Sequence, residues 1–191
     1  MSYSQNDEER IILNYFEGVT GRLLDIGAYD GRTFSNSLAL LERGWHGVLI
    51  EASPKVFTHL MTNTAHVSVD LVNACVVPDE LDLVTFYDND GAVATMNEAN
   101  HERWKAKTNF KAITVMTTNV SRLLKRFGTS YDMVNIDVEG GSVDLFEALV
   151  PRLPDVRCWI VEHDGMMERC TQLMEGWNVA YSNGENIIFT R

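Results

Sequence analysis

The sequence contains few basic residues, few cysteines and few prolines. Sixteen lysines and arginines stand against 27 aspartates and glutamates, which gives a formal net charge of −11. Binding to nucleic-acid phosphates or to an anionic membrane surface requires clustered positive charge. We therefore expect neither a nucleic-acid partner nor a membrane partner. A neutral or cationic small molecule fits this charge better.

The three cysteines are Cys75, Cys158 and Cys170, and their spacing fits neither a disulfide framework nor a zinc site. The polar and acidic residues 1–10 do not resemble a secretory signal. No apolar run approaches the ~18 residues that a membrane span needs. These absences lead us to expect a cytoplasmic protein with reduced cysteines.

No linker or internal repeat divides the chain, which contains only four prolines. At 191 residues, its length is typical of one domain. We expect residues 1–191 to form a single domain, with an N-terminal helix and lead-in at 1–21 and a flap at 88–110. The acidic surface is compatible with a monomer or a homodimer.

Short apolar runs alternate with amphipathic segments along most of the chain. Strands are predicted at 23–27, 47–51, 67–77, 83–87, 113–116, 132–138, 156–161, 177–181 and 186–190. Helices are predicted at 6–16, 33–43, 54–61, 120–127, 143–150 and 166–174. This alternation indicates an α/β fold with a mostly parallel sheet, an antiparallel C-terminal hairpin and helices on both faces.

Acidic residues stand at the carboxyl ends of four predicted strands, where open α/β sheets bind their ligands. They are Asp25, Glu51, Asp137 and Glu162. An acid after the first strand attracts a cationic group, and Glu51 can accept hydrogen bonds from both hydroxyls of a ribose. Together they suit S-adenosylmethionine, which carries a sulfonium and an amino group. Alone, Glu51 can also be explained as a solvated acid at a strand end.

The turn after the first strand has the spacing D-x-G-x-x-x-G, from Asp25 through Gly27 to Gly31. Its two glycines let a ligand approach the backbone closely, although tight turns also use glycine for purely structural reasons. The turn lacks the G-x-G-x-x-G pattern of dinucleotide enzymes and the lysine of a phosphate-binding P-loop. It therefore does not favour a pyrophosphate ligand.

Two segments carry a resemblance to a known family. Residues 24–31 resemble motif I of the class I S-adenosylmethionine-dependent methyltransferases, and residues 134–140 resemble the I-D-V-E-G signature of the FkbM-type methyltransferases. The resemblance extends over residues 22–191 and implies a Rossmann-like class I methyltransferase sheet. The family often has lysine where Asn135 stands and an acid where Ser142 stands, so substrate preference does not carry over.

The resemblance also implies a cofactor site. In that site Asp25, Gly27 and Gly31 hold the methionine part of S-adenosylmethionine, and Glu51 holds the ribose. Ala28 completes the loop. Asn73 either lies near the adenine or forms a plain hydrogen bond from a strand end to backbone.

The reacting end is predicted at Asp137, Glu139, Glu162, His163 and Asp164, which follow two neighbouring strands of such a sheet. In one interpretation Asp137 and Glu162 bind Mg²⁺ or Ca²⁺, and the metal lowers the pKa of an acceptor hydroxyl. In the other, Asp137 orients the acceptor and either Asp137 or His163 takes its proton. His163 can instead be a structural histidine, and Glu139 can cap the following helix.

The predicted function is S-adenosylmethionine-dependent O-methylation of a small-molecule hydroxyl, with the family pointing to sugars and secondary metabolites. Four residues of the predicted flap either cover and contact the acceptor or belong to a plain exposed loop: His101, Arg103, Trp104 and Lys105. Two alternatives stay open. One is a catalytically inactive protein that still binds S-adenosylmethionine, and the other is a nicotinamide-dependent oxidoreductase on a similar fold.

Overall fold

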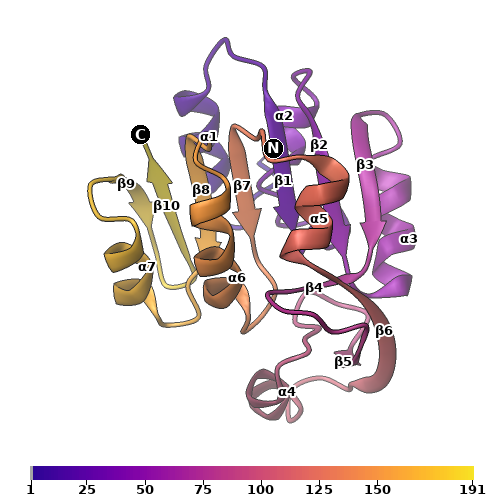
Figure 1. Ribbon diagram of the computed structural model, residues 1–191. Coiled ribbons are helices and arrows are strands. Elements are labelled where there is room, and N and C mark those ends of the chain that lie inside the picture. Colours follow the sequence, from indigo (N-terminus) through magenta and orange to yellow (C-terminus); the bar gives the residue numbers. More distant parts are fainter. Residues whose placement is uncertain (1) are drawn as a thin grey trace.

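The structure, a computed structural model, describes residues 2–191. Its centre is a seven-stranded sheet with the order β3-β2-β1-β7-β8-β10-β9 (Figure 1). Strand β10 is antiparallel to β8 and β9, and the other pairs are parallel. The strands are β1 (Arg22–Ile26), β2 (His46–Glu51), β3 (Ser68–Asn73), β7 (Met133–Ile136), β8 (Cys158–Glu162), β9 (Asn178–Ser182) and β10 (Asn186–Thr190).

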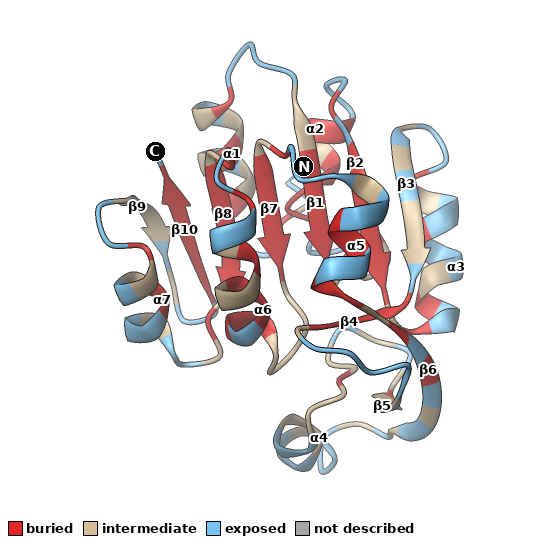
Figure 2. Ribbon diagram, viewed as in Figure 1, coloured by how far each residue is buried: buried red, intermediate tan, exposed pale blue. Residues whose placement is uncertain are grey.

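Helices cover both faces of this sheet. One apolar core joins the sheet to α1 (Glu8–Tyr15), α2 (Leu38–Leu41) and α3 (Pro54–Asn63). A second core joins the opposite face to α5 (Val120–Phe127), α6 (Ser142–Leu149) and α7 (Met167–Leu173), with a 3₁₀ turn at Val150–Arg152. The central strands are buried on both sides (Figure 2), as expected of a parallel sheet. The predicted α/β fold is confirmed.

A smaller sheet lies beyond the carboxyl ends of the main strands (Figure 1). It has the order β4-β6-β5, formed by β4 (Cys75–Val77), β6 (Lys111–Asn119) and β5 (Leu83–Asp88), and α4 (Glu98–Trp104) accompanies it. The single strand predicted at 67–77 is therefore wrong. The backbone N–H of Ala74 bonds to the carbonyl of Glu51, and after this residue the chain leaves β2 and pairs with β6.

Two further predictions need correction. The helix expected at 33–43 is limited to α2, because Phe34 has a φ of +59°, which an α-helix excludes, and the Asp30 carboxylate accepts the N–H groups of Arg32 and Thr33. The predicted flap is less irregular than expected. It contains α4, whose first turn is capped by the side chain of Asn97.

Other local predictions are confirmed. Ser53 caps α3 by accepting the N–H of Val56, and Pro54 occupies the first helical position. Within residues 2–191, none of the helices has the length and apolar character needed to cross a membrane.

Candidate active site

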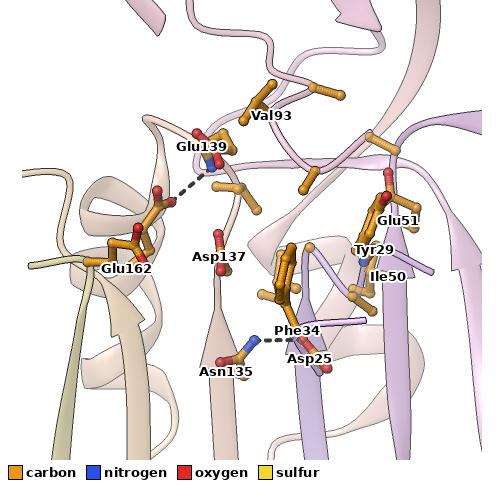
Figure 3. A pocket seen from close by; sticks show the side chains of 18 of the residues that line it. Asp25, Tyr29, Phe34, Ile50, Glu51, Val93, Asn135, Asp137, Glu139 and Glu162 are labelled. Carbon is orange, nitrogen blue, oxygen red and sulfur yellow. Dashed lines mark hydrogen bonds between the residues drawn. The ribbon is translucent and has the colours of Figure 1, made fainter. Parts of the chain in front are cut away.

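A cavity of about 480 Å³ lies between the carboxyl ends of the main sheet and the segment that carries the small sheet and α4 (Figure 3). Four elements of the main sheet contribute its polar floor: β1, β2, β7 and β8. The predicted residues of the cofactor site and the reacting end that line it are Asp25, Gly27, Ala28, Glu51, Asp137, Glu139, Glu162 and Asp164. The topology therefore brings the strand-end acids to one cavity, as expected.

Glu51 ends β2 with a buried carboxylate that is only 8% exposed. Its two oxygens accept the backbone N–H groups of Tyr29, at 3.1 Å, and Ser53, at 2.7 Å. Burial raises the pKa of Glu51 to about 7, and these backbone donors oppose the rise. Its remaining lone pairs can accept further donors from a ligand in the cavity.

Asp25 is held by two neutral partners. One carboxylate oxygen accepts the hydroxyl of Ser37, and the other accepts the amide nitrogen of Asn135 at 2.8 Å. Asn135 in turn accepts the amide nitrogen of Asn36 at 3.1 Å. Burial raises the pKa of Asp25, while the bonds from Ser37 and Asn135 lower it. The carboxylate is thus fixed in orientation but has no positive partner among residues 2–191.

Gly27 brings the end of β1 against the residue that follows β7. Its φ is +86°, and a Cβ at this position would lie 1.7 Å from the carbonyl oxygen of Asp137. The N–H groups of Gly27 and Ala28 both bond to the carbonyl of Ile50. This position therefore requires glycine for close backbone approach, whether or not a ligand is bound.

Two predicted cofactor residues do not line the cavity. A Cβ on Gly31 would collide with Leu60 and Thr64, so this glycine permits close packing against α3. The side-chain amide of Asn73 donates to the carbonyls of Glu51, at 2.8 Å, and Ala52, at 3.2 Å. Both residues shape the backbone behind the cavity.

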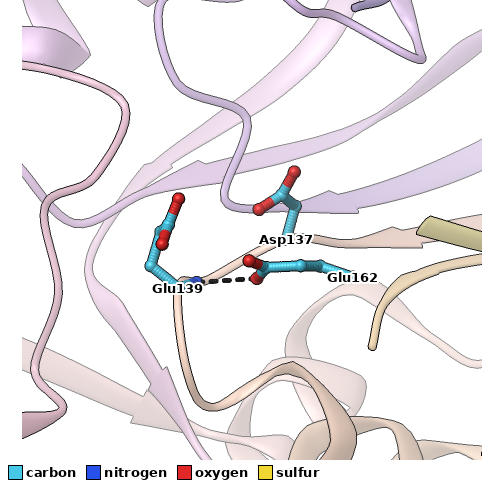
Figure 4. Close-up of side chains that lie close together, drawn as sticks. All are labelled: Asp137, Glu139 and Glu162. Carbon is cyan, nitrogen blue, oxygen red and sulfur yellow. Dashed lines mark hydrogen bonds between the residues drawn. The ribbon is translucent and has the colours of Figure 1, made fainter. Parts of the chain in front are cut away.

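Three carboxylates converge at the other end of the cavity. The side chains of Asp137, Glu139 and Glu162 each offer an oxygen within 4.8 Å of the others (Figure 4). One oxygen of Glu162 accepts both the N–H of Glu139 and the hydroxyl of Ser142, each at 3.0 Å. Glu139 itself has a φ of +55°, a strained conformation for a residue with a side chain.

These three acids resist ionisation. Burial is the main cause, and repulsion from the neighbouring carboxylates adds to it, so the pKa values of Asp137 and Glu162 are raised and that of Glu139 is raised to about 8. At neutral pH such a group holds protons or binds a cation. Three hard oxygen ligands with this spacing suit Mg²⁺ or Ca²⁺.

His163 does not reach the cavity. It is 4% exposed, its Nδ1 accepts the N–H of Gly165 at 3.1 Å, and its Nε2 lies 3.1 Å from the carbonyl of Asn183. Since a backbone N–H can only donate, Nδ1 is the acceptor and Nε2 carries the hydrogen. Both nitrogens are occupied by backbone, so the structure assigns His163 to the loop between β8 and α7 and does not support its predicted role as a base.

Sequence reasoning missed several residues of this cavity. Phe34, which is 49% exposed, and Tyr29 both line it, and both have positive φ. Gln5 and Asn186 reach the cavity from opposite ends of the chain. Of the four predicted cover residues, Arg103 and Trp104 line it, from α4, whereas His101 and Lys105 do not.

The sequence of residues 25–178 matches the family described as Methyltransferase FkbM domain. The chain belongs to the FkbM methyltransferase family. The resemblance carried by residues 24–31 and 134–140 is therefore confirmed, and it is a family of S-adenosylmethionine-dependent methyltransferases. No curated protein matches this FkbM chain significantly.

Solved structures resemble the FkbM chain at low sequence identity. Monomeric WbdD matches with a TM-score of 0.50 and 14% identity, over 98% of this chain and 41% of that one. A SAM-dependent methyltransferase from Agrobacterium tumefaciens matches at 0.49 and 11%, over 96% and 61%. Trm5b from Pyrococcus abyssi matches at 0.47 and 10%, over 96% and 46%. The chain thus spans 41% to 61% of these proteins, and the match to WbdD supports the fold alone.

Proposed function

We propose that this chain transfers a methyl group from S-adenosylmethionine to a hydroxyl oxygen of a small molecule, such as a sugar or a secondary metabolite. One observation carries the proposal. A single cavity of about 480 Å³ has Glu51 beside the glycine turn at one end and the carboxylates of Asp137, Glu139 and Glu162 at the other. Membership of the FkbM family supports a methyltransferase over a nicotinamide-dependent oxidoreductase.

The cofactor end fits S-adenosylmethionine, which supplies a methyl group on positively charged sulfur. Glu51 would accept hydrogen bonds from the ribose hydroxyls. Asp25, with Gly27 and Ala28, would face the methionine part, where its uncompensated charge attracts the amino group. Asn73 and Gly31 act from behind the cavity, where they fix the backbone on which Glu51 and the glycine turn depend.

The acceptor end supplies a base. S-adenosylmethionine would supply the methyl group to the acceptor oxygen, and the Asp137 carboxylate would accept the proton that the acceptor hydroxyl loses. Burial and neighbouring acids raise the pKa of Asp137, which makes it a better proton acceptor than an exposed aspartate. Positioning supplies much of the acceleration, because the methyl group is already activated.

A divalent cation is the alternative for this end, in which Asp137 would be a metal ligand and not the base. Asp137 and Glu162, now joined by Glu139, offer the oxygen ligands that would hold Mg²⁺. Mg²⁺ at this place would lower the pKa of the acceptor hydroxyl.

The three buried, free cysteines support the proposed cytoplasmic location.

The test is calorimetric titration of the full chain with S-adenosylhomocysteine, with and without Mg²⁺, followed by screening of hydroxylated acceptors for methyl transfer. We expect micromolar binding that Glu51→Ala and Asp25→Ala abolish, while the exposed control Glu17→Gln retains it. Unchanged affinity in both site variants contradicts the cofactor assignment. Binding without turnover of any acceptor favours an inactive protein that retains the cofactor.

A further inference from the structure

Phe34 presents an apolar ring to the cavity in a backbone conformation that residues with a side chain rarely adopt. Its side chain is half exposed, and its φ is +59°. Among residues 2–191, it is the only one of the exposed large apolar side chains that lines the cavity. Both the backbone strain and the exposed ring cost stability, which points to a role in binding a ligand.

The backbone on both sides of Phe34 is fixed by hydrogen bonds. Before it, the Asp30 carboxylate accepts the backbone N–H groups two and three residues further along the chain, at 2.8 and 2.6 Å. After it, the hydroxyl of Ser35 accepts the backbone N–H groups two and three residues further along, at 3.3 and 3.1 Å. The strained conformation of Phe34 therefore belongs to an ordered loop.

The same loop is attached to the strands that carry the acids of the site. The amide nitrogen of Asn36 donates to Asn135 of β7 at 3.1 Å. The hydroxyl of Ser37 donates to Asp25 at the end of β1. These two bonds follow Phe34 by two and three residues, so its ring is held close to the carboxyl ends of both strands.

The ring of Phe34 stands between the two ends of the cavity. Figure 3 shows it pointing into the cavity, with Asp137 on one side of it and Glu51 on the other. In S-adenosylmethionine the sulfur is bonded to the ribose unit, to the methionine chain and to the methyl group. A cofactor with its ribose at Glu51 and its methyl group directed toward Asp137 would therefore have its sulfur beside this ring.

The charge of the surroundings favours a cation at this ring over a neutral apolar group. The face of an aromatic ring is negative and attracts a cation that lies within about 6 Å of the ring centre. The carboxylates of Asp25 and Asp137 line the same cavity, and among the described lining residues only Arg103 is basic. A neutral group would gain from the ring alone, whereas a sulfonium gains from the ring and from the carboxylates.

We propose that the ring of Phe34 binds the sulfonium of S-adenosylmethionine and thereby positions the methyl group between the cofactor end and the acceptor end. The inference rests on the proposed function, since it requires this cofactor in the cavity. Because the sulfur of S-adenosylhomocysteine is neutral, Phe34 favours the methyl donor over the spent product.

The experiment measures the affinity of the full chain for S-adenosylmethionine and for S-adenosylhomocysteine by isothermal titration at pH 8. The two ligands differ only in the methyl group and the positive charge at sulfur. Phe34→Leu should weaken the binding of S-adenosylmethionine relative to that of S-adenosylhomocysteine by about threefold or more. Phe34→Tyr, which keeps an aromatic face, should retain the wild-type ratio. The control Phe127→Leu makes the same change in α5, outside the cavity, and should also retain it.

A second substitution changes the charge of the ring and keeps its shape. A trifluorinated phenylalanine incorporated at position 34 has less negative charge on its face and should also lower the preference for S-adenosylmethionine. It decides the question if Phe34→Leu does not fold. A trifluorinated ring that leaves the ratio unchanged would overturn the proposal, as would a change of less than threefold in Phe34→Leu or an equal change in Phe127→Leu.

Binding by the wild-type chain is scored separately. If neither ligand binds, the proposed function fails. If both ligands bind with a ratio that does not depend on the ring, the proposed function stands and the role of Phe34 is refuted.

Discussion

The affinity for cofactor should fall as the pH is lowered from 8 to 6, because Glu51 titrates in that interval. Its pKa is raised to about 7 by burial. In the proposed assignment, ribose hydroxyls donate to the ionised carboxylate, so the cofactor should bind the form that predominates above pH 7. The affinity for the cofactor is therefore highest at pH values above the pKa of Glu51 and falls as the pH drops below that pKa.

The magnitude follows from the ionised fraction of Glu51. With a pKa of about 7, this fraction falls from about 0.9 at pH 8 to about 0.1 at pH 6. If only the ionised form binds, the affinity drops about tenfold, which corresponds to about 1.4 kcal/mol. Binding at pH 6 should also release about 0.9 proton for each cofactor bound, since the carboxyl must ionise.

Isothermal titration with S-adenosylhomocysteine at pH 6, 7 and 8 measures both quantities, provided that two buffers of different ionisation enthalpy are compared. Glu51→Gln is the decisive variant. This substitution replaces the ionisable carboxyl group with an amide, which leaves one acceptor oxygen for the two backbone N–H donors of Tyr29 and Ser53. We expect weaker binding and a flat profile from pH 6 to 8. The reasoning is refuted if wild type binds equally at pH 6 and 8, or if Glu51→Gln keeps the tenfold dependence.

Three further outcomes are expected. Gly27→Ala should lower the free energy of unfolding by about 3 kcal/mol in urea titrations, since its Cβ would lie 1.7 Å from the Asp137 carbonyl; equal stability would contradict the backbone geometry. His163→Gln should lower the melting temperature but leave the affinity for S-adenosylhomocysteine within twofold, and a large loss of affinity would restore a role for His163 in the site. Mg²⁺ binding at pH 7 should release protons, because burial and repulsion raise the pKa values of Asp137 and Glu139; calorimetry in two buffers would show none if the cation binds elsewhere.

The sequence predicts the acidic floor of the cavity because parallel strands end at one edge of a sheet. Strand order and the positions of the strand ends are enough to predict that four acids lie together: Asp25, Glu51, Asp137 and Glu162. The local features that the sequence predicts correctly depend on residues that lie close together in the chain. Ser53 and Pro54, for example, mark the start of α3 within three residues of one another and of their bonding partner.

What the sequence did not predict depends on contacts between distant segments. The break at Ala74 reflects pairing of the following residues with β6, some forty residues further along the chain. Asn186 reaches the site through a bond to Glu8, 178 positions away. His163 looked catalytic because it follows a strand, but its ring turns toward Asn183 and Gly165, and no pattern within the strand reveals that direction.

The environment of Asp25 connects the departure at Asn135 to cofactor binding. FkbM-type sequences often carry lysine at this position, and a lysine amine would neutralise the neighbouring carboxylate. Here the partners of Asp25 are Ser37 and Asn135, both neutral, so burial raises the pKa of Asp25 without a compensating charge. A cationic ligand in the cavity would then be the counter-ion that this carboxylate lacks. If the amino group of S-adenosylmethionine binds there, as proposed, it would stabilise ionised Asp25, and the cofactor would supply the positive charge that Asn135 does not.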